Sequence, residues 1–342
     1  MGSELLCDVI SISNRVFGKK LHALVFSGSY SRGEQTILVH NNKKWIAGDL
    51  EFTIFQANYS WLFRRGHLEF EKAINDLVKV NNLKVDYDIK PIAFSSFIPR
   101  TLFWFETLAA EKIYGGLKNK IEKKIESYSV DMSDLFEVLN HSAIAIMKSF
   151  LSHDLGETIS VYKFKYQILK STLDLFVPLL AAEEEVIPFH VNRYKKVIEL
   201  GLLGDLEGEY KDVLEVIYKA KISGEEHEVS MFDDLSIHDC LNFYLLLNKR
   251  CQQNIQSKGF VMGKRFKGNR SIPRLLFAIK NKLFQILNVK KNNLSLSSGE
   301  LIHINFDTIK LLKDIIGRDS IFDNLKFIEE RYELNKQIYR YL

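Results

Sequence analysis

The stretch DLEFTIF, residues 49–55, alternates polar with apolar side chains as far as Ile54. In a β-strand successive side chains point to opposite faces of the sheet, so Asp49, Glu51 and Thr53 share one face. The apolar residues between them share the other face and are suited to a core. The stretch therefore predicts a strand that presents two carboxylates on one side and packs on the other.

The segments before and after this strand have patterns of their own. The apolar run LHALVFSG, residues 21–28, predicts a buried strand that ends at Gly28. Residues 4–17 and 60–80 repeat apolar side chains at helical spacing. The order helix, strand, strand, helix is thus expected over the first 80 residues.

A second strand that carries acids follows. Residues 83–94, LKVDYDIKPIAF, alternate again and place Asp86 and Asp88 on one face. A helix is expected after Thr101, and the pair Gly115 and Gly116 is a helix stop signal.

Beyond that glycine pair the spacing is helical almost throughout. We predict an α+β fold with a mixed β-sheet and flanking helices over residues 1–115. An all-helical C-terminal domain is expected over residues 116–342, where it would bind an acceptor or close over a cleft.

Composition narrows the class of protein. The 342 residues are 46% hydrophobic, which supports a sizeable core, and 47 Lys and Arg against 43 Asp and Glu give no chain-wide field for nucleic acid. The odd, widely spaced Cys7, Cys240 and Cys251 fit neither a disulfide framework nor a zinc site. No stretch approaches the roughly 20 apolar residues that cross a bilayer. We expect a cytoplasmic protein with no membrane partner.

The acids suggest a metal-dependent reaction. Two carboxylates at i and i+2 on one strand, with a third from a neighbouring strand, suit a pair of divalent ions such as Mg²⁺ or Mn²⁺. Glycine and serine at a turn from strand to helix let backbone N–H groups and a hydroxyl approach phosphate. Gly28 and Ser29 stand at such a turn.

The runs GSYSRGEQTIL, GDLEFTI and VDYDIKP resemble the signature of the polymerase-beta-like nucleotidyltransferase superfamily. That superfamily includes nucleotidyltransferase toxins, aminoglycoside nucleotidyltransferases and bacterial cyclic-oligonucleotide synthases. The resemblance covers roughly residues 20–115. It implies that Gly28 and Ser29 bind the triphosphate and that Arg32, which completes the turn with Gly33, is also a nucleotide-binding residue. The metal ligands that it implies are Asp49, Glu51 and Asp88.

This sequence departs from the family pattern in three places. Gly48 stands where serine is frequent, Glu51 stands where many members have aspartate, and a polar insertion HNNKK occupies residues 40–44. The third acid is ambiguous because Asp86 and Asp88 share a strand face. Asp88 is preferred, since DIKP matches the order of acid, two residues and proline in related enzymes.

Weaker signals extend the candidate site. Glu106 is at a place where related enzymes carry a group facing the acceptor, although an ordinary helix-surface glutamate is the alternative. A basic, glycine-rich segment is a further candidate for contacts to phosphate or acceptor, with a solvated loop as the alternative. Its principal cations are Lys264, Arg265 and Lys267.

The predicted activity is transfer of an NMP from an NTP to an acceptor hydroxyl, with release of pyrophosphate. The acceptor stays open among a small molecule or sugar, a protein, a tRNA and a second nucleotide. A cyclic-oligonucleotide synthase and a toxin acting on tRNA or protein are therefore alternatives within the class. A non-catalytic nucleotide-binding or protein-interaction module is the alternative outside it.

Overall fold

The computed structural model describes residues 2–41, 43–56, 66–81, 84–91, 102–109, 113–116, 132–152, 158–223 and 226–257. The chain divides into two compact units. Unit 1 comprises Met1–Val130, Val186–Lys196 and Glu215–Asp233, and unit 2 comprises Asp131–Glu185, Val197–Leu214 and Asp234–Leu342.

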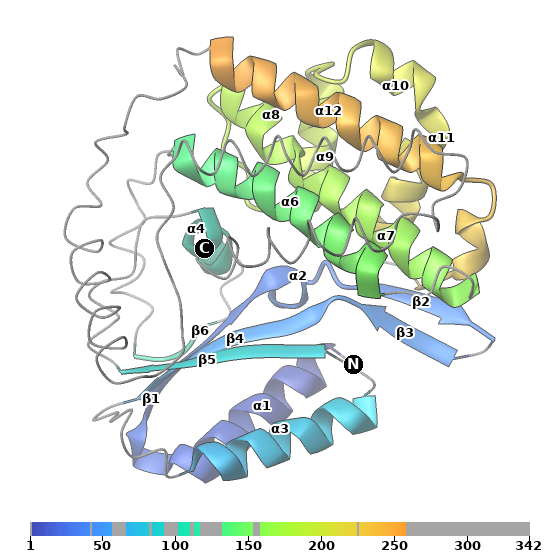
Figure 1. Cartoon of the computed structure of the whole chain (residues 1–342). Coiled ribbons are helices and arrows are strands. Elements are labelled where there is room, and N and C mark those ends of the chain that lie inside the picture. The colour runs from blue at the N-terminus through green and yellow to red at the C-terminus, as the bar shows by residue number, and fades with distance from the viewer. Residues whose placement is uncertain are drawn as a thin grey trace, which may run out of the picture. The chain divides into compact units, whose positions relative to one another are not determined.

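Unit 1 is built on a four-stranded mixed sheet (Figure 1). Its strands, in spatial order, are β5 (Lys84–Pro91), β4 (Asp49–Gln56), β1 (Leu21–Ser27) and β6 (Ile113–Gly115). β4 is parallel to β5 and antiparallel to β1, and β6 is antiparallel to β1. The two strands expected to carry acids are therefore immediate neighbours.

Two helices cover one face of this sheet, α1 (Gly2–Phe17) and α3 (His67–Asn81) (Figure 1). The core between them and the strands is rich in aromatic rings, with Phe52 stacked on Tyr87 at a centroid distance of 5.6 Å. The short helix α2 (Gly28–Ser31) packs against β1 and β4, and α4 (Leu102–Ala109) packs against β1. The predicted α+β class, a mixed sheet with flanking helices, is confirmed.

A second sheet in unit 1 has the order β3 (Lys43–Ala47), β2 (Thr36–His40), β7 (Glu226–Glu228). β2 and β3 form a hairpin across the polar insertion, and β7 pairs with β2 in parallel. The sequence did not predict β7, which falls in the region expected to be helical. Pairing of β7 with β2 brings late residues of the chain into unit 1. The expected domain boundary between residues 115 and 116 lies next to residues 117–131, which are outside the described part of the chain. This boundary therefore stays a prediction.

Unit 2 is helical where the structure describes it. Its elements are α6 (Met132–Ser152), α7 (Thr158–Asp174), α8 (Phe176–Ala182), α10 (Asp205–Glu209) and α12 (Ile237–Ser257). α9 (His190–Glu199) and α11 (Lys211–Ile217) cross the division between the units along the chain. α7 packs against α6, α8 and α12. None of the helices in the described part of the chain is long and apolar enough to cross a membrane.

The cysteines of unit 2 are buried thiols. Cys240 and Cys251 lie on α12 with no exposed surface, and neither forms a disulfide. Burial raises the pKa of the Cys240 thiol to about 12, which keeps it protonated at physiological pH. These cysteines therefore serve as core residues.

Candidate functional site

The alternation predicted for β4 and β5 is present in the structure. Leu50, Phe52 and Ile54 are at most 2% exposed and belong to the core under α1 and α3. Val85, Tyr87 and Ile89 of β5 pack against the same core. The odd-numbered positions of β4 and the even-numbered positions of β5 therefore share the opposite face. These positions include all four acids that the sequence singled out.

The strand register decides which acids are neighbours. Glu51 pairs with Asp86, whereas Asp88 pairs with Thr53 and Asp49 pairs with Lys84. Paired positions on adjacent strands lie about 4.8 Å apart, and each further step of two residues along a strand adds about 6.6 Å. Asp86 is thus level with Glu51, and Asp88 is one step beyond it, farther from Asp49.

Gly28 brings the end of β1 directly against Glu51. It follows β1 with a φ of +72°, and a Cβ placed there would lie 3.1 Å from Cδ of Glu51. Ser27, which pairs with Glu51, has its hydroxyl 3.4 Å from Oε2 of that carboxylate. Both the backbone conformation and the close approach require glycine at position 28.

Ser29 lies beside the start of β4. A Cβ at Gly48 would be 3.5 Å from Oγ of Ser29, and Gly48 has a φ of +136°. A positive φ of this size favours glycine over the serine that the family often carries at this position. The structure therefore brings together Gly28, Ser29, Gly48 and Glu51, which are drawn from two separate stretches of sequence.

Internal hydrogen bonds fix the turn that contains these residues. The Ser31 hydroxyl donates to the Gly28 carbonyl at 2.9 Å, and the Glu34 N–H donates to the Ser29 carbonyl at 2.8 Å. Tyr30 points into the core under α1 and α3 and is 5% exposed. The turn is therefore held both by its own backbone and by packing.

Arg32, expected to contact nucleotide, lies in buried ion pairs. Its Nε is 2.8 Å from a carboxylate oxygen of Glu34, and its side chain is 7% exposed. One of its terminal nitrogens is 2.9 Å from Glu106. The guanidinium of Arg32 is thus already paired with two carboxylates.

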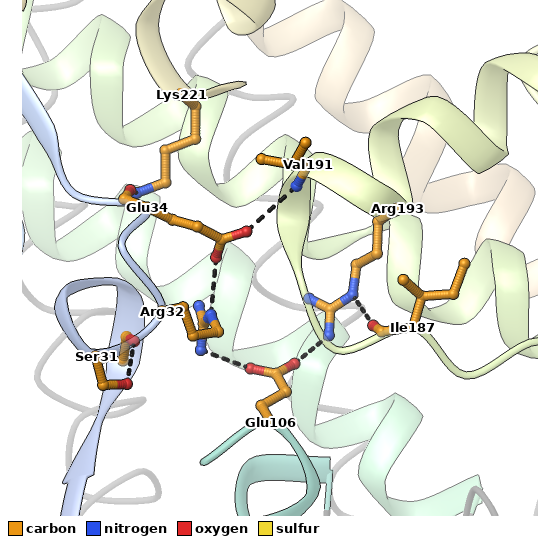
Figure 2. Close-up of polar contacts among 9 residues, drawn as sticks. Ser31, Arg32, Glu34, Glu106, Ile187, Val191, Arg193 and Lys221 are labelled. Atoms are coloured by element: carbon orange, nitrogen blue, oxygen red, sulfur yellow. Dashed lines mark hydrogen bonds and ion pairs between the residues drawn. The ribbon is translucent and has the colours of Figure 1, made fainter. Parts of the chain in front are cut away.

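Glu106 is not an ordinary surface glutamate. Its side chain is 15% exposed, and its second oxygen pairs with Arg193 (Figure 2). Its carboxylate therefore lies between two guanidinium groups. The sequence pointed to this residue but gave no indication of these partners.

Sequence reasoning missed the other members of this network. Arg193 and Lys221 stand in the basic runs NRYKK and YKAK, which have the composition of solvated helix surfaces. In the structure both are at most 5% exposed, and the ammonium of Lys221 donates to the Glu34 carbonyl at 2.7 Å. Only tertiary pairing reveals them, since no local pattern distinguishes them from their exposed neighbours.

Other predicted site residues lie outside the described part of the chain. Lys264, Arg265 and Lys267 fall beyond residue 257, and the side chains of Asp49 and Asp86 are not described. Among the described residues there is no cluster of three or more His, Cys, Asp or Glu suited to a metal ion. Asp88 is described and its side chain is exposed.

Comparisons with known proteins give no relative from which to transfer a function. No protein-family model, no curated protein and no solved structure matches this chain. Functional inference therefore rests on the residues and their geometry.

Proposed function

We propose that the chain is a metal-dependent nucleotidyltransferase of the polymerase-beta-like superfamily, which transfers an NMP from an NTP to an acceptor hydroxyl and releases pyrophosphate. The observation that carries the proposal is the approach of Gly28 to Glu51, 3.1 Å from its Cδ to the position of a Cβ. A turn suited to phosphate and a strand suited to metal ligands are far apart in sequence, and the fold joins them at one point.

The acids offer a donor set that fits divalent ions. Asp49 and Glu51 are two residues apart on one strand, and β5 supplies a third acid from the adjacent strand. Carboxylate oxygens are the ligands that Mg²⁺ and Mn²⁺ prefer. Like charges so close disfavour one another unless a cation lies between them. We assign Asp49, Glu51 and an acid of β5 as the residues that would hold the ions.

The register favours Asp86 as the third acid. It pairs directly with Glu51, whereas Asp88, preferred from the sequence motif, pairs with Thr53. A compact cage around two ions about 3.5–4 Å apart needs ligands at neighbouring positions. Asp88, which is one step farther along β5 from Asp49, then lies outside that cage.

The turn residues would bind the triphosphate. The lack of a side chain at Gly28 lets the turn lie against Glu51, and the Ser29 hydroxyl and the backbone N–H groups of the turn are donors for the phosphate tail. Bound ions would neutralise triphosphate charge and stabilise the charge that develops at phosphorus. The protein's own part is to hold the acids and the turn so that phosphate and acceptor hydroxyl meet in line.

Incubation with labelled NTPs tests the proposal. Wild-type protein with each α-labelled NTP and Mg²⁺, alone and with cell extract, is expected to release pyrophosphate and yield a labelled acceptor. Mass analysis of that acceptor identifies its chemical class. Absence of transfer under all conditions, with nucleotide still bound, would instead support a non-catalytic nucleotide-binding module.

A further inference from the structure

Four charged side chains of unit 1 form a continuous series of ion pairs, Glu34, Arg32, Glu106 and Arg193 (Figure 2). Their side chains are between 3% and 15% exposed. Buried ion pairs are held in place strongly, because removal of one partner leaves an uncompensated charge. In this series, which we term the Glu106 network, each member is therefore costly to remove.

Each end of the Glu106 network is anchored to backbone. Glu34 accepts a hydrogen bond from the Val191 N–H at 3.2 Å, and its own carbonyl accepts one from Lys221 at 2.7 Å. Arg193 donates from Nε to the Ile187 carbonyl at 2.6 Å. Segments that lie far along the chain thereby hold residues immediately after the phosphate-binding turn.

Arg32 connects the network to that turn. It directly follows α2, whose first residue is Gly28, the residue against Glu51. Glycines with positive φ flank Arg32, at Gly28 and Gly33, and they add backbone freedom at both ends of the segment. The planar guanidinium of Arg32, held between two carboxylates, adds a directional side-chain restraint to the hydrogen bonds and packing that hold the turn.

We infer that Glu106 and Arg193 are positioning residues: through Arg32 they hold the Gly28–Ser31 turn at the distance from Glu51 that nucleotide transfer requires. The catalytic consequence of this inference rests on the proposed function, whereas the restraint of the turn by Glu106 and Arg193 does not. Arg32 then acts as a link within the protein and not as a contact to nucleotide. Glu106 likewise acts through Arg32 and not on the acceptor.

Amide hydrogen exchange tests the structural part without any assay of activity. Glu106→Gln removes the shared charge, and Arg193→Lys keeps the charge but loses the planar fork. Glu226→Gln is the control, since it removes the exposed ion pair with Lys44 in the same unit. Loss of a hydrogen bond to a charged group is expected to speed exchange of residues 27–34 roughly tenfold to a hundredfold.

The pattern of exchange decides the result. Faster exchange in residues 27–34, with α1 unchanged and the control variant like wild type, supports the inference. Unchanged exchange in residues 27–34, or an equal increase throughout unit 1 for both variants, overturns it. If Glu106→Gln does not fold, Arg193→Lys decides alone.

Kinetics separate this role from direct nucleotide binding. Displacement of the turn is expected to lower kcat by tenfold or more in Glu106→Gln, with a smaller rise in KM for the NTP. Contact of Arg32 with phosphate would predict a raised KM for Arg32→Lys and little effect of Glu106→Gln. Wild-type protein that transfers no nucleotide contradicts the proposed function alone, because the exchange result stands independently of it.

Discussion

Replacement of Gly28 by alanine probes the contact that joins the turn to the acid strand. The added methyl group would lie 3.1 Å from Cδ of Glu51 and 3.3 Å from both of its carboxylate oxygens. Gly33 offers a matched control, because it has the same φ of +72° but a methyl group added there would meet nothing within 4 Å. The two variants share backbone strain, and only one of them touches Glu51.

The expected magnitudes follow from this difference. Alanine in the left-handed region costs about 1–2 kcal/mol, so both variants should lose this much stability. In Gly28→Ala the Glu51 carboxylate must also move away from the new methyl group by a few tenths of an ångström. Because a misplacement of 1 Å can reduce a rate about a hundredfold, a shift of a few tenths of an ångström is expected to lower the kcat of Gly28→Ala by several-fold to about tenfold. Gly33→Ala should retain most of its activity.

Three measurements check this prediction. Chemical denaturation gives the free energy of unfolding, single-turnover transfer gives the rate, and Mn²⁺ binding by electron paramagnetic resonance reports the metal ligands without turnover. Weaker Mn²⁺ binding should accompany the loss of rate in Gly28→Ala only. Equal losses of rate and Mn²⁺ affinity in the two variants would refute the reasoning, since strain alone would then explain both.

Four other perturbations have distinct expected outcomes. Asp86→Asn should reduce transfer more than Asp88→Asn, because Asp86 pairs with Glu51; a greater loss at Asp88 would contradict the use of register. In native protein at pH 8 a disulfide reagent should modify exposed Cys7 but not buried Cys240. Burial raises the pKa of Cys240 from 9.0 to about 12. The contribution of the buried thiol to the free energy of unfolding is therefore full below pH 9 and declines as the pH rises toward 12. Denaturation at several pH values across that range measures this decline. Replacement of the three basic-segment cations by alanine should raise KM more than it lowers kcat and weaken the salt dependence of binding, while unchanged values would exclude the segment from the site. Those cations are Lys264, Arg265 and Lys267.

Local patterns in the sequence were sufficient for β1, β4 and β5 of the main sheet. They did not predict β6, which occupies Ile113–Gly115 where a helix was expected to end; the helix itself ends at Ala109. The alternation in residues 49–55 depends only on successive side chains, and Leu50, Phe52 and Ile54 do pack together in the core under α1 and α3. Gly28 was predicted at the end of a strand, and β1 does end at Ser27. Periodicity of this kind is a property of the segment itself and does not depend on its partners.

The register of the strands and the pairing of distant segments could not be predicted from local patterns. Asp86 and Asp88 have the same periodicity, and only the pairing of β5 with β4 shows which is level with Glu51. β7 has three residues and pairs with a strand far earlier in the chain, so no local pattern predicts it. The partners of Glu106 come from segments that meet only in the folded chain, which is why Arg193 and Lys221 were not anticipated.

Asp49 and Glu51 are the residues that we propose to hold the metal ions for nucleotide transfer. The most direct measurement compares transfer of α-labelled NMP by wild type, Asp49→Asn and Glu51→Gln, with Mg²⁺ and with chelator. Asp76→Asn, an exposed acid on α3, is the control. We predict Mg²⁺-dependent label in wild type and control, and none above background in folded Asp49→Asn or Glu51→Gln. Wild-type transfer by either folded variant, or full transfer by wild type in chelator, would contradict the account.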